Sequence, residues 1–231
     1  MRHTRKGFSV SVKCKDFRCD ESGAAMLEFT AAAFTFFIIL FGVVEFSNVF
    51  FQWNIATKAV QLGARLAAVS SPVSSDLATL TGLSNSVLPG DPMPAFDRVC
   101  TSNSTTGATG ACTGGTYDAV KSAAAMQTIV FGRASSGTPY TSCQSAPATV
   151  GMCNIFIHNP PLTPQNVIVR YQYTGLGYAG RPGGPVPTIT VSLTGLTYDW
   201  IMIGGIMGFS PINLPTFATT VTGEDLTAIG S

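Results

Sequence analysis

Residues 24–44, AAMLEFTAAAFTFFIILFGVV, decide the fold of this 231-residue chain. They contain a single ionisable side chain, Glu28. At 1.5 Å per residue a helix of this length measures about 32 Å, enough to cross the roughly 30 Å hydrocarbon core of a bilayer. The stretch therefore predicts a permanent membrane-spanning helix. A cleaved secretory signal, whose apolar region is only about 7–15 residues long, is the alternative interpretation.

A helical pattern continues beyond this stretch. Apolar or small residues recur every three or four positions as far as Val69, and polar side chains occupy the other side. The run SSPVSS at 70–75 ends the helix, because Pro72 cannot continue it. A helix over 24–69 would measure roughly 69 Å. We expect its first half to lie in lipid and its second half to form an amphipathic stalk that packs on the distal domain.

The charge of the chain is low and unevenly spread. Only 11% of the residues are charged, less than half the roughly 25% of a typical soluble domain, and the net charge is +1. Residues 1–23 hold six Lys or Arg and three Asp or Glu, a net of +3, and the rest of the chain carries a net of −2. A basic head before an apolar helix stays in the cytoplasm. We therefore expect the membrane as a partner, and no nucleic acid.

The six cysteines fall into two groups. Cys14 and Cys19 lie in the basic head, where we expect reduced thiols and no metal site. The second group follows the anchor: Cys100, Cys112, Cys143 and Cys153. An even count in an exported segment favours two disulfides, and four cysteines allow three connectivities. The local pairing, 100–112 and 143–153, closes the shortest loops and is the preferred one.

Strand-like segments dominate the chain after residue 153. They are enriched in β-branched and aromatic residues and lie at 154–159, 167–173, 188–193 and 216–223. The segment 117–131 predicts a helix between the two disulfides. The expected fold class is α+β, with a long N-terminal transmembrane and stalk helix packed on a small antiparallel sheet. The expected domains are a basic cytoplasmic leader at 1–23, the helix at 24–69 and an extracytoplasmic disulfide-containing domain at 70–231.

Three further motifs do not indicate a catalytic or cofactor site. GLGYAG at 175–180 fits a dinucleotide fingerprint, but RPGGPVP follows it and no helix can begin there. His158 near Cys153 is expected to be a plain surface residue. WIMIGGIMGF at 200–209 is too short to span a membrane, and it forms either a buried hairpin or an exposed patch for a partner or the bilayer surface. We expect no cofactor and no metal.

Glu28 and Gly23 form the most informative pair in the sequence. A carboxyl group inside a spanning helix is costly unless it is paired or neutralised, although at headgroup depth it would simply reach the interface. Cleavage after Gly23 would give Ala24 a cationic α-amino group about one helical turn from Glu28. The segment ESG-AAML-EF, from Glu21 to Phe29, resembles the processing site of type IV prepilins.

The resemblance extends over residues 23–68, which are similar to the TadE-like family of the tight-adherence (Flp-type) pilus machinery. The start Gly-Ala-Ala-x-x-Glu-Phe covers Gly23 to Phe29, and Gly-x-x-Glu-Phe covers Gly42 to Phe46. The motif Ala-x-x-x-Gly-Ala-Arg-x-Ala-Ala then covers Ala59 to Ala68. Near the C-terminus, ATTVTGED at 218–225 is similar to the closing strand of the family.

This resemblance implies a pseudopilin that is not an enzyme. It would be a single-pass inner-membrane protein, with a cytoplasmic N-terminus and a periplasmic C-terminal domain, needed for pilus assembly. Its implied partners are a prepilin peptidase, other pilin-like subunits and the pilus assembly platform. Gly23, Ala24, Glu28 and Phe29 match the processing site. A membrane-anchored extracytoplasmic enzyme and a pilus-borne adhesin are the alternative hypotheses.

Overall fold

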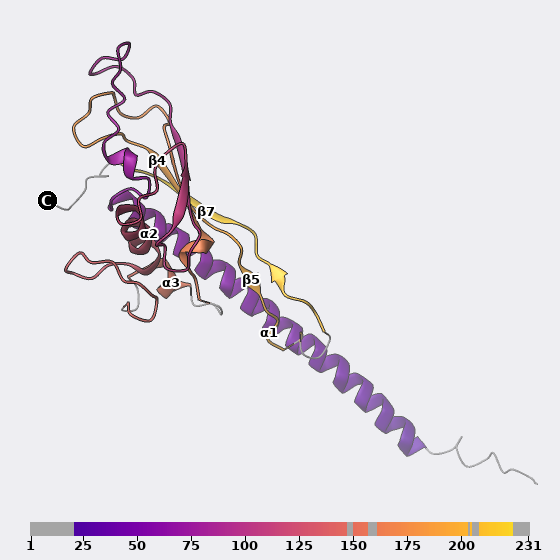
Figure 1. The fold of residues 1–231 in the computed structure, drawn as a ribbon. Helices are drawn as coiled ribbons and strands as arrows, with labels where there is room; N and C mark the ends of the chain where they lie inside the picture. Colours follow the sequence, from indigo (N-terminus) through magenta and orange to yellow (C-terminus); the bar gives the residue numbers. More distant parts are fainter. Residues whose placement is uncertain (1–20, 147–149, 157–160, 203, 205–207, 224–231) are drawn as a thin grey trace, which may run out of the picture. The chain divides into compact units, whose positions relative to one another are not determined.

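The structure is a computed structural model that describes residues 21–146, 150–156, 161–202, 204 and 208–223 (Figure 1). The chain divides into two compact units, residues 1–46 and 47–231. Each unit is described by itself below. The α+β class expected from the sequence is confirmed.

Helix α1, Glu21–Ala68, includes almost all of the predicted helix 24–69. Its last turn carries Arg65, a cation where the helix dipole favours one. The backbone N–H of Val69 still donates to the Arg65 carbonyl at 3.2 Å, and the Ser70 hydroxyl donates to the Leu66 carbonyl at 2.5 Å. These bonds satisfy carbonyls that the end of the helix leaves open. The helix itself ends before Pro72.

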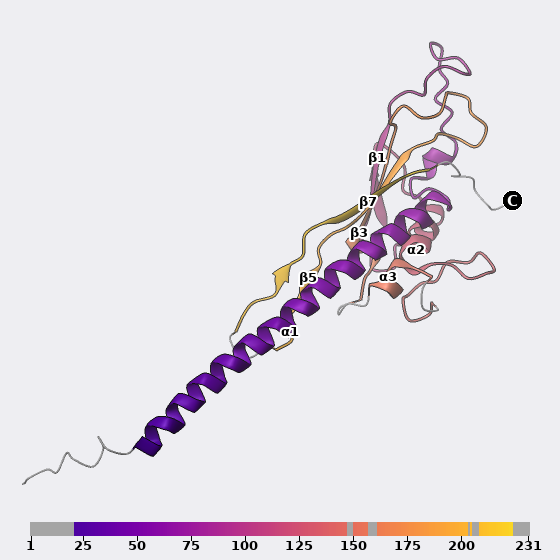
Figure 2. The ribbon, with the colours of Figure 1, turned by 180° about the vertical axis from the view of Figure 1, so that it is seen from behind.

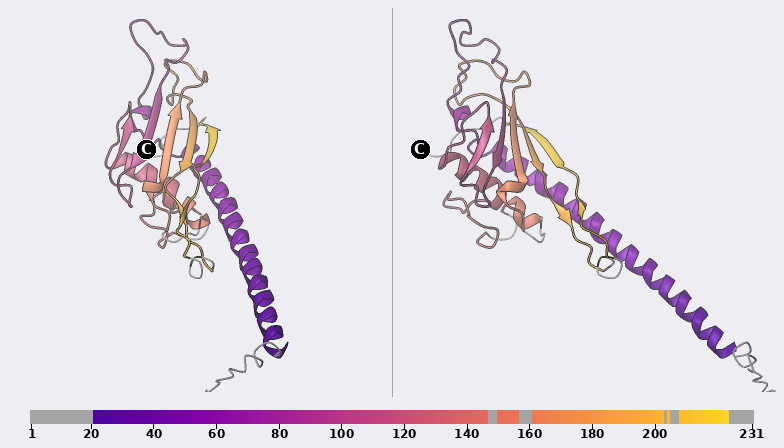
Figure 3. Two further views of the ribbon diagram at one scale, coloured as in Figure 1. Left: turned by 90° about the vertical axis from the view of Figure 1, so that its right-hand side faces the viewer. Right: turned by 45° about the vertical axis from the view of Figure 1, so that its right-hand side comes forward.

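The second unit contains a five-stranded antiparallel sheet in the order β2-β1-β3-β4-β7 (Figure 3). Its strands are β1 Asp97–Ser102, β2 Gly110–Thr113, β3 Val167–Gln172, β4 Thr188–Leu193 and β7 Phe217–Thr222. A separate two-stranded sheet pairs β5, Thr197–Tyr198, with β6, Ile212–Asn213. The predicted strands at 167–173, 188–193 and 216–223 are therefore confirmed.

One face of the five-stranded sheet forms the core. Alternate residues of β3 and β4 are buried and stand opposite one another, as in the pairs Val169↔Val191 and Tyr171↔Ile189. On the other face Thr190 and Thr220 share a hydroxyl hydrogen bond of 3.0 Å. This alternation is what a sheet with one solvated face requires.

Two helices cover the buried face (Figure 2). The part of α1 in the second unit contributes small residues, and α2, Lys121–Phe131, contributes larger ones. The α1 and α2 residues of this core are Ala56, Ala59, Val60, Ala64 and Ala67 of α1 and Ala125, Met126, Ile129, Val130 and Phe131 of α2. These α1 side chains share one buried core with the sheet, which confirms the expected packing of the stalk.

Helix α2 starts four residues later than the predicted helix 117–131. The Asp118 carboxylate accepts hydrogen bonds from the backbone N–H groups of Val120 and Lys121, both at 2.7 Å, and so acts as the cap. Tyr117 lies before this cap, and its hydroxyl donates to the Gly107 carbonyl instead.

The predicted strand at 154–159 is wrong in its three described residues, because Met152–Ile155 form the short helix α3 and Phe156 is its C-cap. Met152, Cys153 and Phe156 are buried, which is the i, i+1, i+4 spacing of a helix and not the alternation of a strand. Residues 157–160 lie outside the described residues. Short 3₁₀ helices occur at Ser75–Ala78 (η1) and Pro164–Asn166 (η2).

Candidate functional site

The predicted processing residues Gly23, Ala24, Glu28 and Phe29 all lie in the first turns of α1 and are exposed. A Cβ atom added to Gly23 would meet no heavy atom within 4 Å. Phe29 exposes 72% of its surface. The structure thus brings the four residues together on one helix, with no described part of the chain covering Gly23.

Residues 26–46 of α1 present a largely apolar helix surface. Its exposed side chains are Met26, Leu27, Phe34, Phe36, Phe37, Ile39, Leu40, Val43, Val44 and Phe46. A helix that is apolar all round belongs in a protein core or in a membrane. Gly23–Ala68 is the one described helix that is long and apolar enough to cross a bilayer.

The two threonine hydroxyls of this segment are satisfied within the helix. The Thr30 hydroxyl donates to the Met26 carbonyl at 2.8 Å, and the Thr35 hydroxyl donates to the Ala31 carbonyl at 2.9 Å. Internal satisfaction is what a helix in hydrocarbon needs, because lipid offers no hydrogen-bond partner.

The two carboxylates of α1 beyond Gly23 differ in exposure. Glu28 is exposed, whereas Glu45 exposes only 1% of its surface. Each is followed by a phenylalanine, so Glu45-Phe46 repeats the Glu28-Phe29 pair. In the sequence, Glu45 stands out only as part of the family motif Gly42 to Phe46. The repeated Glu-Phe pair is the signal that distinguishes this second carboxylate.

Both disulfides lie in the second unit and follow the local connectivity, Cys100–Cys112 and Cys143–Cys153. Cys100 and Cys112 are register partners on β1 and β2, with Cα atoms 4.1 Å apart. This spacing is close to the roughly 4.5 Å of a closely spaced antiparallel pair. Cys14 and Cys19 lie outside the described residues.

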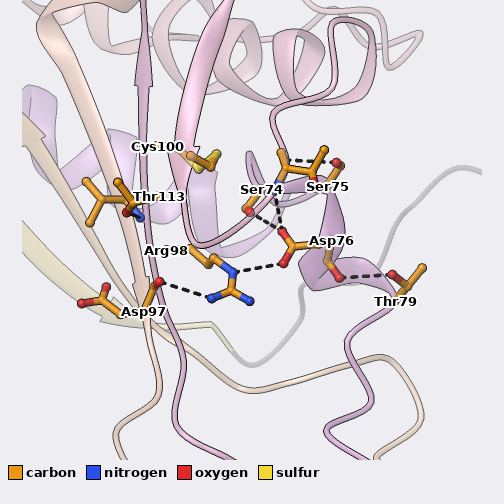
Figure 4. Close-up of polar contacts among 11 residues, drawn as sticks. Ser74, Ser75, Asp76, Thr79, Asp97, Arg98, Cys100 and Thr113 are labelled. Atoms are coloured by element: carbon orange, nitrogen blue, oxygen red, sulfur yellow. Dashed lines mark hydrogen bonds and ion pairs between the residues drawn. A yellow bond between two sulfur atoms is a disulfide. The ribbon is translucent and has the colours of Figure 1, made fainter.

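A polar cluster ties the segment after α1 to the sheet (Figure 4). The Asp76 carboxylate accepts hydrogen bonds from Arg98 Nε at 3.0 Å, from the Thr116 backbone N–H at 3.3 Å and from the Ser74 hydroxyl. Burial alone raises the pKa of Asp76, but the hydrogen bonds from Ser74, Arg98 and Thr116 lower it more, so the pKa lies below its ordinary value. The cluster therefore joins η1, through an ionised Asp76, to β1 and to residue 116.

The remaining motifs fall in loops. Residues 175–180 lie between β3 and β4, and Gly175, Gly177 and Gly180 adopt positive φ angles there. His158 lies outside the described residues. The described part of the chain contains no group of three or more His, Cys, Asp or Glu side chains placed to hold a metal. The 200–209 segment connects β5 to β6. Its side chains Ile201, Met202 and Phe209 are exposed, so a buried hairpin is wrong for these three residues, whereas Trp200 is half-buried and packs against the core.

Comparison with known proteins bears on the N-terminal helix alone. No curated protein and no solved structure matches the chain. Residues 23–65 match the model of the TadE-like protein family. The matched segment begins at Gly23 and ends in the last turns of α1, so it includes the predicted processing residues and the apolar surface. The resemblance to the TadE-like family is therefore confirmed as a match over residues 23–65.

Proposed function

We propose that this protein is a membrane-anchored pilin-like protein, a pseudopilin, needed for the assembly of a tight-adherence type IV pilus. One observation carries the proposal. The segment that matches the TadE-like family, residues 23–65, lies within the helix that carries most of the exposed large apolar side chains of the described chain. The family is associated with pilus assembly, and an exposed apolar helix of this length suits a membrane anchor.

The proposed location is the inner membrane, with residues 1–23 in the cytoplasm and residues 70–231 in the periplasm. The excess of positive charge in 1–23 supports this orientation. The two disulfides of the second unit support it independently, because such bonds persist in oxidising compartments outside the cytoplasm.

We further propose that a prepilin peptidase cleaves after Gly23. The peptide bond between Gly23 and Ala24 would be cut, leaving Ala24 as the new N-terminus with Glu28 as its fifth residue and Phe29 as its sixth. Support comes from the prepilin-like sequence and from the open surroundings of Gly23. Other pilin-like subunits and the assembly platform would then contact the processed helix.

N-terminal sequencing of the protein recovered from membranes tests the processing. We expect the mature chain to start at Ala24, and we expect Gly23→Val to leave the precursor uncut because a β-branched side chain obstructs the scissile bond. Gly42→Val is the matched control, since Gly42 also has no neighbour within 4 Å of an added Cβ and lies in the same helix. A mature protein that retains residues 1–23 would contradict the processing and leave the anchor untouched.

Fractionation separates this function from the two alternatives. A pseudopilin that acts in assembly stays with the membrane, and its deletion removes the pilus. A pilus-borne adhesin would be recovered in sheared pilus material. An anchored enzyme would leave piliation intact when deleted, and that result would contradict the proposed function.

A further inference from the structure

The tip of the β5–β6 hairpin is an apolar surface on a fixed base. Thr197 pairs with Asn213 and Tyr198 with Ile212, so residues 199–211 form the connection. The Leu214 N–H donates to the Leu196 carbonyl at 2.8 Å, and Leu196 and Tyr198 are buried in the core. The base of the hairpin is thus part of the folded domain.

The side chains beyond this base face outward. Ile201 is 65% exposed, Phe209 52% and Met202 39%. Trp200 holds the two arms together, because its ring lies 5.9 Å from that of Phe209 and its Nε1 donates to the Ser210 carbonyl at 2.9 Å. The sequence from Trp200 to Gly223 contains no Asp, Glu, Lys or Arg. An uncharged apolar surface of this kind marks contact with a partner or a membrane.

A second group of exposed aromatic residues belongs to the same end of the second unit. Phe50, Phe51 and Trp53 of α1 are 61%, 60% and 45% exposed. Trp53 contacts the ring of Phe217, edge to face, with centroids 5.0 Å apart. Only three residues separate Phe217 from the end of β6, so this contact lies close in sequence to the β5–β6 hairpin. Two segments that are far apart in the sequence therefore supply aromatic side chains to one region.

The short length of chain between this region and the apolar stretch favours lipid as the occupant. Phe50 follows Val44, the end of that stretch, by six residues, which span at most about 20 Å even when fully extended. The region is thus tethered within reach of the bilayer surface. Aromatic residues gather at membrane interfaces, where tryptophan combines an apolar ring with a polar N–H.

We propose that the tip of the β5–β6 hairpin inserts into the periplasmic interface of the bilayer that the apolar helix spans. The inserted side chains would be Ile201, Met202 and Phe209, and the half-buried Trp200 would lie directly behind them. This proposal rests on the proposed membrane anchor. Its consequence is that the periplasmic domain is held at the membrane by two contacts and not by the N-terminal helix alone.

The chain contains two tryptophans, which allows a direct test. The full-length variant Trp53→Phe leaves Trp200 as the single fluorophore. It is reconstituted into phosphatidylethanolamine and phosphatidylglycerol vesicles, with or without bromine in the upper acyl chains. We expect bromination to lower the Trp200 emission at least about twofold, because its ring contacts Phe209, and an inserted Phe209 would lie about 5–10 Å into the interface.

Two further variants serve as controls. The first control chain combines Trp53→Phe, Trp200→Phe and Leu88→Trp, so that its single fluorophore is at position 88, which is 65% exposed. Leu88 lies in the loops at the Thr188 end of β4, whereas β5 follows the opposite end of that strand, Leu193. We expect bromination to leave that emission unchanged. Ile201→Asp added to the Trp200-only protein should abolish the quenching, because a carboxylate opposes insertion.

Resistance to carbonate extraction, measured on the same vesicles, separates this proposal from the anchor. Equal Trp200 emission in both lipids, in protein that resists extraction, would overturn the insertion of the hairpin while the anchor stands, and would leave a protein partner as the cover of this surface. Protein that carbonate extracts would overturn the anchor and the hairpin insertion together.

Discussion

The hydroxyl oxygen of Tyr171 accepts a hydrogen bond of 3.0 Å from the backbone N–H of Val73, across 98 positions of sequence. Tyr171 belongs to β3 and is completely buried, and Val73 follows the end of α1 and is also buried. Burial raises the pKa of Tyr171 well above its ordinary value, so the phenol stays neutral at physiological pH. This bond joins the exit of the stalk helix to the middle of the sheet.

Tyr171→Phe should therefore destabilise the second unit. The substitution keeps the ring but leaves the buried Val73 N–H without its acceptor, which costs about 1–3 kcal/mol. Chemical denaturation of the full chain in detergent measures the change in the free energy of unfolding. Tyr178→Phe is the control, because Tyr178 is 46% exposed, and its effect should stay within about 0.5 kcal/mol. Equal effects of the two variants would contradict a structural role for this bond.

Asp76 should make stability depend on acid pH. Its pKa is lower in the folded protein than its ordinary value of 3.8, so the unfolded chain takes up the proton more readily. The stabilisation is complete above about pH 4 and is lost as the pH falls through the folded pKa. Between pH 7 and pH 3 we expect Asp76→Asn to lose less unfolding free energy than the wild type.

The control for this experiment is Asp199→Asn, at an exposed carboxylate. Its stability should follow the wild-type pH dependence. At pH 7, Asp76→Asn should itself cost about 1–3 kcal/mol, because hydrogen bonds to a charged acceptor are lost. Parallel pH curves for the wild type and Asp76→Asn would show that Asp76 does not carry this dependence.

The disulfides should be formed in protein isolated from cells without reductant. We expect Cys100, Cys112, Cys143 and Cys153 to resist alkylation until a reductant is added. Free thiols at all four positions would contradict the proposed periplasmic location. The double variant Cys100→Ala, Cys112→Ala should lose about 3 kcal/mol of unfolding free energy, since the bond closes a loop of about a dozen residues.

Gly151 should be intolerant of any side chain. An added Cβ would lie 2.6 Å from the Val130 carbonyl oxygen and 2.7 Å from the Gly132 nitrogen, and backbone atoms cannot rotate away. Because φ at Gly151 is −134°, the cost of Gly151→Ala is steric and should reach about 1–3 kcal/mol in denaturation. Gly137→Ala, at an open position with φ of +86°, controls for backbone strain alone. A smaller loss at Gly151 than at Gly137 would contradict this close approach.

The sequence predicts those elements whose signal is local. The apolar stretch predicts α1, and β-branched and aromatic residues in partial alternation predict β3 and β4. The hairpin of β1 and β2 escaped prediction because Ser, Thr and Gly dominate residues 101–111, and its stability depends on pairing with β3 and on the Cys100–Cys112 bond. The short helix α3 escaped because apolar content alone does not separate a four-residue helix from a strand.

The candidate site was predictable for a different reason. Gly23, Glu28 and the apolar run lie next to one another in the chain, so their relationship needs no tertiary structure. The contacts of Asp76 with Arg98 and of Val73 with Tyr171 join distant segments, and no local pattern indicates them. The same holds for the hairpin tip, whose apolar composition is visible in the sequence but whose exposure depends on where β5 and β6 pair.

Glu28 provides the last prediction, which concerns assembly. If its carboxylate pairs with the α-amino group of Ala24, in the same or a neighbouring subunit, Glu28→Gln should leave membrane insertion intact, since a neutral amide enters lipid more easily than a carboxylate. Association with other pilin-like subunits should weaken on the order of a hundredfold, because removal of one partner leaves a buried charge uncompensated. Glu28→Asp keeps the charge and should retain most of the association. Co-purification with pilus components measures all three proteins, and equal recovery of wild type and Glu28→Gln would mean that Glu28 only reaches the headgroup region.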